Sequence, residues 1–161
     1  MQPGTGLVCG KSVSNSDSEI FRKHKDDLVR YAAALVGPDA ADDVVSAVVL
    51  RLLERRSLSD LEDARAYLFR AVLNQARNVG SRRRPSFAVV DAAQPPWPEP
   101  QPEVLSAVMN LPLRQRAATF LVYWADLSVA ETSRLMGARP GTIKRYLYLA
   151  RRSLKEVLDG H

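Results

Sequence analysis

The chain of 161 residues has one cysteine, two histidines and no long apolar run. A single cysteine cannot form an internal disulfide or a cysteine metal site, and the two histidines lie far apart in the sequence. Nothing approaches the ~18 consecutive apolar residues of a membrane-spanning helix, and residues 1–16 hold no run of signal-peptide length. We therefore expect a cytoplasmic protein without a metal, a cofactor or a membrane-inserted segment.

Charge is abundant but unevenly distributed. The net charge is +5 and the pI is about 9.7, which permits a polyanionic partner without requiring one. Between Asp39 and Asp63 lie seven acids, against three arginines and no lysine. The strongly basic segments are Arg82–Arg84 and the C-terminal stretch. The acidic segment is either an ordinary solvated helix or a docking surface for a basic partner.

The most informative stretch runs from residue 128 to residue 158 and predicts two helices joined by a short glycine turn. Ser128 and Glu131 fit a capping box, and Gly137 suits a left-handed C-cap. Pro140 fits the first turn of the second helix, where its missing N–H is not needed. Apolar residues then recur every three or four positions, at Ile143, Leu147, Ala150, Leu154 and Leu158.

The opposite side of this second helix is basic, and no acid falls between Arg139 and Lys155. A short helix, a glycine turn and a longer basic helix form the helix-turn-helix arrangement, whose second helix enters the major groove of DNA. A solvated basic face on an ordinary helical hairpin is the simpler alternative. The turn, the caps and the absence of acids together favour DNA binding.

Three further helices are predicted in the N-terminal half. The first starts at a capping box of Ser16 and Glu19 and stops at Gly37 and Pro38. The second runs from near Asp39 to about residue 56, and the third from residue 64 to about residue 81. The expected buried stripe of the third helix is Tyr67, Leu68, Ala71, Val72 and Val79.

The segment 85–101 carries five prolines and predicts an extended linker, which spans at most ~56–61 Å. Two predicted helices, 102–110 and 112–125, then precede the helix-turn-helix pair. We therefore predict an all-α fold of two small helical domains joined by a Pro-rich linker. The predicted units are a disordered tail over 1–15, a three-helix domain over 16–84, the linker over 85–101 and a four-helix domain over 102–159.

Both domains resemble the sigma-70 family, and in particular its small extracytoplasmic-function (ECF) group. In the C-terminal domain, Gly141-Thr142-Ile143-Lys144 and Ala150-Arg151-Arg152 resemble region four of that family. In the N-terminal domain, the residues that resemble region two are Asp42, Asp43, Leu50, Arg51, Ala66-Tyr67-Leu68 and Asn74. The resemblance covers roughly residues 17–84 and 103–158.

This resemblance implies a non-catalytic subunit that gives RNA polymerase its promoter specificity and helps to open the DNA. At the minus-thirty-five element it implies contacts from Arg139, Thr142, Lys144, Arg145, Tyr148, Arg151 and Arg152. At the minus-ten element, where a base leaves the stack, it implies contacts from Asn74, Arg77, Asn78, Arg82, Arg83 and Arg84. For the β′ clamp helices of core RNA polymerase it implies Asp42, Asp43, Val45, Arg51 and Leu52.

The resemblance further implies contact with the β flap of the polymerase and regulation by an anti-sigma protein. The reach of the linker suits two DNA sites separated by ~17 base pairs at about 3.4 Å each. A stand-alone helix-turn-helix regulator with an all-α sensing domain is the main alternative, but it has no use for a DNA-melting helix. An enzyme is disfavoured because the sequence offers no acid/base pair, activated nucleophile, metal cluster or phosphate loop.

Overall fold

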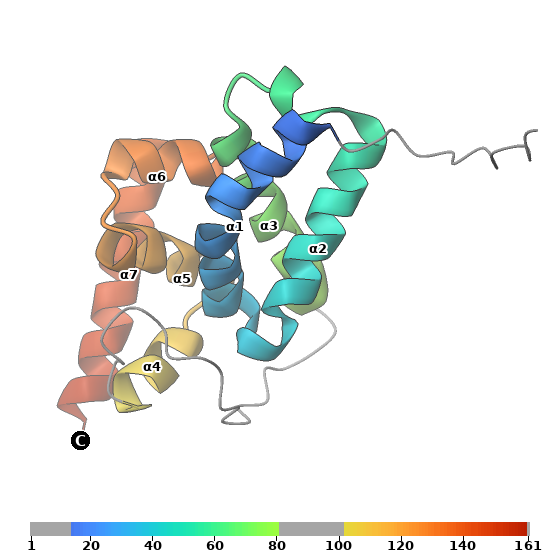
Figure 1. Ribbon diagram of the computed structural model, residues 1–161. Helices are drawn as coiled ribbons and strands as arrows, with labels where there is room; N and C mark the ends of the chain where they lie inside the picture. The colour runs from blue at the N-terminus through green and yellow to red at the C-terminus, as the bar shows by residue number, and fades with distance from the viewer. Residues whose placement is uncertain (1–13, 81–101, 161) are drawn as a thin grey trace, which may run out of the picture.

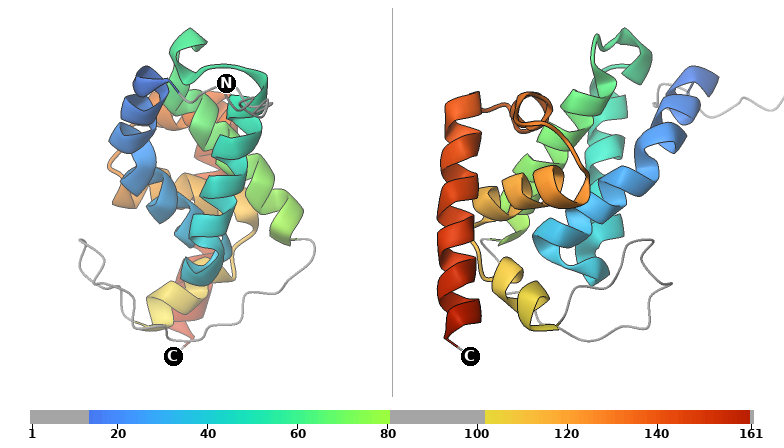
Figure 2. Two further views of the ribbon diagram at one scale, coloured as in Figure 1. Left: turned by 45° about the vertical axis from the view of Figure 1, so that its right-hand side comes forward. Right: turned by 90° about the vertical axis from the view of Figure 1, so that its left-hand side faces the viewer.

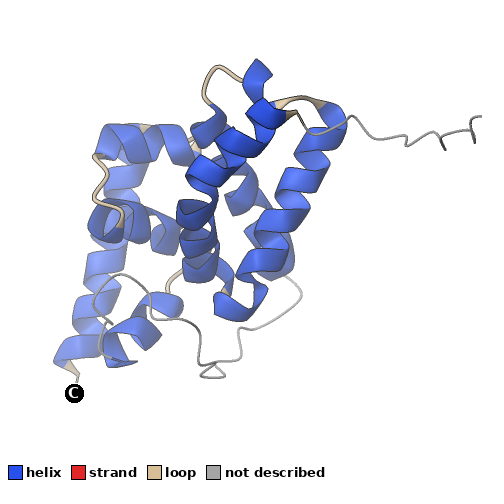
Figure 3. Ribbon diagram, in the orientation of Figure 1, coloured by secondary structure: helices blue, strands red, loops and turns tan. Residues whose placement is uncertain are grey.

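The computed structural model describes residues 14–80 and 102–160, and every regular element within them is helical (Figures 1 and 3). The prediction of an all-α fold is confirmed. The N-terminal half contains α1 (Asn15–Val36), α2 (Pro38–Arg55), the 3-10 turn η1 (Leu58–Asp60) and α3 (Ala64–Gly80). The C-terminal half contains α4 (Pro102–Met109), α5 (Leu113–Thr119), the π-helical turn η2 (Phe120–Trp124), α6 (Val129–Met136) and α7 (Pro140–Asp159). The predicted linker, Arg82–Arg84 and most of the predicted tail lie outside the described residues.

The start of α1 differs from the predicted capping box of Ser16 and Glu19. The N-cap is Ser14, whose Oγ accepts a hydrogen bond from the backbone N–H of Asp17 at 3.1 Å. Two serines lie within reach of the first turn, and spacing alone does not decide between them. The end of α1 follows the prediction, because Gly37 has φ +91° and Pro38 is the first residue of α2.

The buried side of α3 lies about one residue away from the predicted stripe. Leu68 and Val72 are buried as expected, but Tyr67 is 39% exposed. Phe69 and Leu73 are buried instead, since α1 and α6 pack on that side of α3. The prediction that Tyr67 is a core residue is therefore wrong.

The helix-turn-helix pair follows the local signals closely. Ser128 accepts from the backbone N–H of Glu131 at 3.1 Å, and the Glu131 carboxylate accepts from the Ser128 N–H at 2.8 Å. Gly137 has φ +63° and ψ +36°, the left-handed C-cap conformation. Pro140 begins α7, whose buried residues are Ile143, Leu147 and Ala150. Of the predicted apolar stripe, Leu154 is half-buried and Leu158 is exposed, because α7 extends past the elements that cover its first turns.

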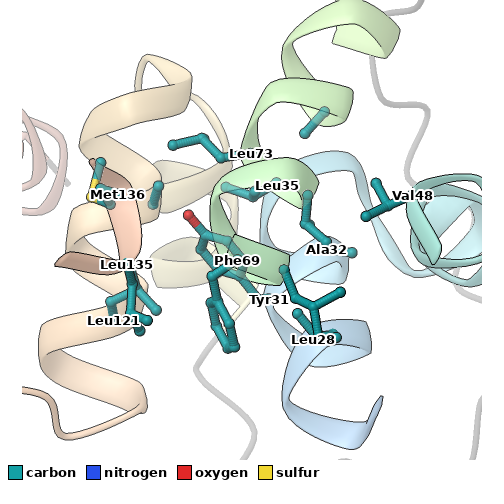
Figure 4. Close-up of a cluster of buried hydrophobic side chains, with 14 of the residues drawn as sticks. Leu28, Tyr31, Ala32, Leu35, Val48, Phe69, Leu73, Leu121, Leu135 and Met136 are labelled. Atoms are coloured by element: carbon teal, nitrogen blue, oxygen red, sulfur yellow. The ribbon is translucent and has the colours of Figure 1, made fainter. Parts of the chain in front are cut away.

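The two halves of the chain share one hydrophobic core. The ring of Tyr31 in α1 lies 5.0 Å from that of Phe69 in α3 and 6.0 Å from that of Phe120 in η2, measured between centroids. Leu135 and Met136 of α6 are buried in the same cluster (Figure 4). Nothing in the sequence indicates this contact, because periodicity shows which side of a helix is apolar but not which helix covers it.

This packing leaves α2 and α7 on opposite sides of the molecule (Figures 1 and 2). Each of the two helices buries its apolar side toward the core and turns its charged side outward. Among the described residues, no helix combines the length and apolar character needed to cross a bilayer.

Candidate nucleic-acid interface

The outward side of α7 carries cations that have no acid beside them. Arg139, Lys144 and Arg145 are exposed and belong to no ion pair found among the described residues. Tyr148 is 63% exposed on the same helix, and Thr142 is half-buried near its start. The first three turns of α7 thus present positive charge, an aromatic ring and a hydroxyl to the solvent.

Two other predicted DNA contacts on α7 already have partners within the protein. The guanidinium of Arg151 lies 5.5 Å from the centroid of the Tyr123 ring in η2 and donates from Nε to the Tyr123 hydroxyl. Arg152 donates to Glu156 one turn later at 3.3 Å, in an exposed ion pair. Of the α7 cations without an ion pair among the described residues, Arg139, Lys144 and Arg145 lie at its N-terminal end, the end that reads bases in helix-turn-helix proteins, and Lys155 lies near its C-terminal end.

A second polar stripe follows the exposed side of α3. Asn74, Arg77 and Asn78 are exposed at helical spacing. The same stripe extends back through Arg70 to Tyr67, both of which are also exposed. The stripe combines amides, cations and an aromatic ring, the groups that hold an unpaired base and its backbone. Arg82, Arg83 and Arg84, the other predicted minus-ten contacts, lie outside the described residues.

An open pocket of about 710 Å³ lies at the N-terminal end of this stripe. Leu61, Glu62 and Asp63 of the loop before α3 form one side, and Tyr67 and Arg70 of α3 form another. The remaining lining residues are Ala66 and Arg134, the latter from α6. The sequence did not single out Tyr67 or Arg70 as functional residues, because its apolar period placed Tyr67 in the core and only the structure shows that the ring is exposed.

Asp63 connects the pocket to the start of α3 and to α6. Its Oδ1 accepts from the backbone N–H of Ala66 at 3.0 Å, and its Oδ2 pairs with the Arg134 guanidinium. Arg70 in turn donates from Nε to the backbone oxygen of Arg134 at 2.9 Å. The bond from Ala66, followed by the bond from Arg134, holds the pKa of Asp63 below its usual value. The helix-turn-helix half of the chain thus closes one side of the pocket.

A buried carboxylate that the sequence did not reveal holds the loop before α3. Oδ1 of Asp17 accepts from Ser57 Oγ at 2.5 Å, from the Leu58 N–H at 2.8 Å and from the Ser59 N–H at 3.3 Å. Asp17 is 4% exposed. These bonds, that from Ser57 foremost, lower the pKa of Asp17. Its stabilising effect is therefore complete above the unfolded pKa near 3.9 and is lost as the pH falls through the lower folded value.

The predicted polymerase contacts on α2 divide into an outer and an inner group. Asp42 and Asp43 are exposed, as is Arg51, which donates to Gln75 of α3 at 3.4 Å. Val45 and Leu52 are 2% and 5% exposed and belong to the shared core, so their side chains cannot meet a partner. These two residues therefore do not belong to a docking surface, because the apolar side of an amphipathic helix is the side that faces the core.

Unlike Val45 and Leu52, Leu50 is 65% exposed and lies on the outer side of α2. Together the two acids Asp42 and Asp43, the apolar Leu50 and the basic Arg51 form the exposed outer side of α2. In the described residues, histidine, cysteine and acidic side chains form no group of three that could hold a metal ion.

Comparisons with known proteins match both halves of the chain to one family. The family model for sigma-70 region 2 matches residues 20–85, and the model for sigma-70 region 4 matches residues 102–154. The ECF RNA polymerase sigma factor SigM of Mycobacterium tuberculosis is 28% identical over 148 residues, which cover 87% of this chain and 76% of that protein.

Two solved structures share the fold. CnrH in complex with the cytosolic domain of CnrY has a TM-score of 0.67 at 23% identity, covering 90% of this chain and 88% of that one. The sigma factor RpoE in complex with the anti-sigma factor NepR, from Bartonella quintana, has a TM-score of 0.66 at 20% identity, covering 91% and 98%. These TM-scores establish a common arrangement of helices, and at identities this low the likeness extends to the fold alone.

Proposed function

Because the chain belongs to the sigma-70 family, in its ECF group, we propose that it is an alternative sigma factor that brings core RNA polymerase to promoters. The observation that carries this proposal is the free cationic side of α7. Its apolar side is buried, its start is fixed by Gly137 and Pro140, and Arg139, Lys144 and Arg145 have no acidic partner among the described residues. A surface of this kind fits the phosphates and bases of a major groove.

In this proposal α7 reads the minus-thirty-five element. Arg139, Lys144 and Arg145 contact bases or phosphates near the start of the helix, together with Thr142 and Tyr148. Arg151 and Arg152 serve as contacts further along, once they leave Tyr123 and Glu156. Phosphate contacts fix the register of the helix, and contacts to base edges supply the sequence preference.

The stripe on α3 and the pocket beside it read and open the minus-ten element. Asn74 and Asn78 hydrogen-bond to bases of the separated strand, and Arg77 with Arg82–Arg84 follows its phosphates. The pocket beside Tyr67 receives a base that has left the stack, since an aromatic ring offers a stacking surface to any base. The outer side of α2, with Asp42, Asp43 and Arg51, binds the β′ clamp helices.

The RpoE structure cited above contains an anti-sigma factor. We extend this to the present chain and propose an anti-sigma partner that controls access to core polymerase. The protein itself contributes no catalysis and works in the cytoplasm beside the polymerase.

The test is transcription in vitro with core polymerase that lacks a sigma subunit. The template is a DNA library randomised at the minus-thirty-five and minus-ten positions, because the promoter sequence is unknown. We expect the full-length protein to select a subset of templates that share two motifs separated by ~17 base pairs. Omission of the protein, with core polymerase alone, gives the background.

A stand-alone helix-turn-helix regulator would give the opposite result. It would select one duplex motif with nanomolar affinity in the absence of polymerase and would yield no promoter-dependent transcript with it. That combination would overturn the proposed function.

A further inference from the structure

The loop that forms one side of the pocket is held in place from its start. In η1, the N–H of Asp60 donates to the oxygen of Ser57 at 3.3 Å, and the N–H of Leu61 donates to the oxygen of Leu58 at 3.2 Å. The Leu58 side chain is buried in the shared core. The pocket residues Leu61–Asp63 follow this turn directly, so their positions depend on where η1 lies.

The position of η1 depends in turn on Asp17. Ser57, Leu58 and Ser59 all donate to a single oxygen, Asp17 Oδ1, across about 40 residues of sequence. The Leu58 bond is buried, and bonds to an ionised acceptor are stronger than bonds between neutral groups. Without the carboxylate, the buried N–H of Leu58 loses its partner and the Ser57 hydroxyl keeps only its contact with the Ser59 hydroxyl at 2.7 Å, which favours a displaced loop.

Asp17 itself lies in α1 and is not a residue that lines the pocket. It is buried and therefore belongs neither to the solvent-facing side of α7 nor to the outer side of α2, to which we assign the other contacts. Its loss would therefore disturb one of the three proposed surfaces and spare the other two. The effect of Asp17 on the pocket can therefore be measured against the two surfaces that its loss leaves intact.

We propose that Asp17 is a positioning residue for minus-ten recognition, which fixes the loop of the base pocket by accepting three hydrogen bonds from residues 57–59. This inference rests on the proposed function. It assigns to a buried residue at the start of α1 a part in promoter selectivity, although that residue never touches DNA.

The experiment uses the doubly randomised promoter library and compares the wild-type holoenzyme with Asp17→Asn. Asn retains the size of the side chain but lacks the charge that strengthens the three bonds. We expect base discrimination at the minus-ten positions to fall about tenfold, roughly the effect of one charged hydrogen bond. Discrimination at the minus-thirty-five positions stays at the wild-type value and serves as an internal reference.

Two further variants separate positioning from simple instability. Ser57→Ala removes the 2.5 Å bond, together with the contacts of the same hydroxyl to Ser59, but leaves the carboxylate on the two backbone N–H groups. We therefore expect a smaller loss at the same positions. Asp26→Asn removes an exposed acid from the same helix and leaves both profiles unchanged. Partial unfolding lowers the active fraction equally for every template and therefore does not change the discrimination ratios.

Each outcome is decisive. Equal minus-ten discrimination in wild type and Asp17→Asn, or equal losses at both promoter elements, would overturn the positioning role while leaving the sigma-factor assignment intact. Failure of the wild-type holoenzyme to select any template would instead refute the proposed function.

Discussion

At the scale of single residues, the cations of this molecule differ in what they already contact. Arg116 is buried and donates to the oxygen of Leu35 at 2.8 Å, and Arg134 pairs with Asp63. By contrast, Lys144 and Arg145 face the solvent from α7 without an acidic partner among the described residues. A cation of the second kind reaches a phosphate without giving up an existing ion pair, and this makes it the better DNA contact.

Replacing Lys144 and Arg145 together by alanine tests this distinction. Each phosphate contact that is lost reduces the slope of log K against log salt concentration by ~0.9. We expect weaker binding to duplex minus-thirty-five DNA and a slope reduced by about 1–2, measured by fluorescence anisotropy from low to moderate salt. The control replaces Lys23 and Lys25, two exposed lysines of α1. A slope equal to that of the wild type would remove both residues from the interface.

At the scale of elements, α2 and α7 present solvent-facing sides of opposite charge, which suit different partners. The side of α7 that faces the solvent is cationic, whereas the outer side of α2 carries Asp42 and Asp43 beside the exposed Leu50. DNA repels the acidic surface and attracts the basic one, so their places on opposite sides of the molecule keep the two partners apart (Figure 2).

The double variant Asp42→Asn, Asp43→Asn tests the acidic side of α2. Both residues are exposed, so the fold tolerates the change. We expect about tenfold weaker association with core polymerase, the size of effect that two exposed ion pairs produce, and unchanged binding to duplex DNA. Glu19→Gln with Asp26→Asn removes the same charge from α1 as a control. Co-purification with core enzyme at the wild-type level would contradict the assignment.

Local features of these helices could be predicted from the sequence. The capping box of Ser128 and Glu131, the C-cap at Gly137 and the start of α7 at Pro140 each depend on residues within a few positions of one another. Such contacts are set by the spacing that the sequence displays directly. The exposure of Lys144 and Arg145 could also be predicted, because the apolar period of α7 places Ile143, Leu147 and Ala150 on the opposite, buried side.

Features that depend on distant residues could not be predicted. Asp17 binds a loop about 40 residues away, so its pattern resembles that of any acid in a first helical turn. The exposure of Tyr67 depends on which side of α3 the other helices cover. Val45 and Leu52 show the reverse case, since their apolar period predicts a core position and only the family resemblance suggested a surface role.

At the scale of the whole molecule, the compact arrangement conflicts with the proposed task. A folded chain of this length has a radius of gyration of about 15 Å and hence a diameter of roughly 40 Å. Two promoter elements separated by ~17 base pairs lie roughly 58 Å apart along the DNA axis. On straight DNA, the two halves therefore have to separate before α3 and α7 can occupy both elements at once.

The shared core contains groups that favour such a separation. The hydroxyl of Tyr31 is buried without a hydrogen-bond partner among the described residues, and burial raises its pKa. Burial also lowers the pKa of Arg116, whose Nε likewise has no partner in the described part of the chain. Opening returns both groups to water, which offsets part of the cost of exposing Phe120, Leu135 and their neighbours.

Distance measurements between two labels test this opening. Asp26 of α1 and Asp159 of α7 are exposed and lie outside the proposed contact surfaces, so cysteines there, with Cys9→Ser, accept a fluorophore pair. We expect one short distance in the free protein and a distance about 20 Å longer in a complex with core polymerase and promoter DNA. Transcription by the labelled protein must match the wild type, which serves as the control. An unchanged distance in an active complex would mean that the closed core persists on the promoter, and the two elements would then have to be brought together by bending the DNA.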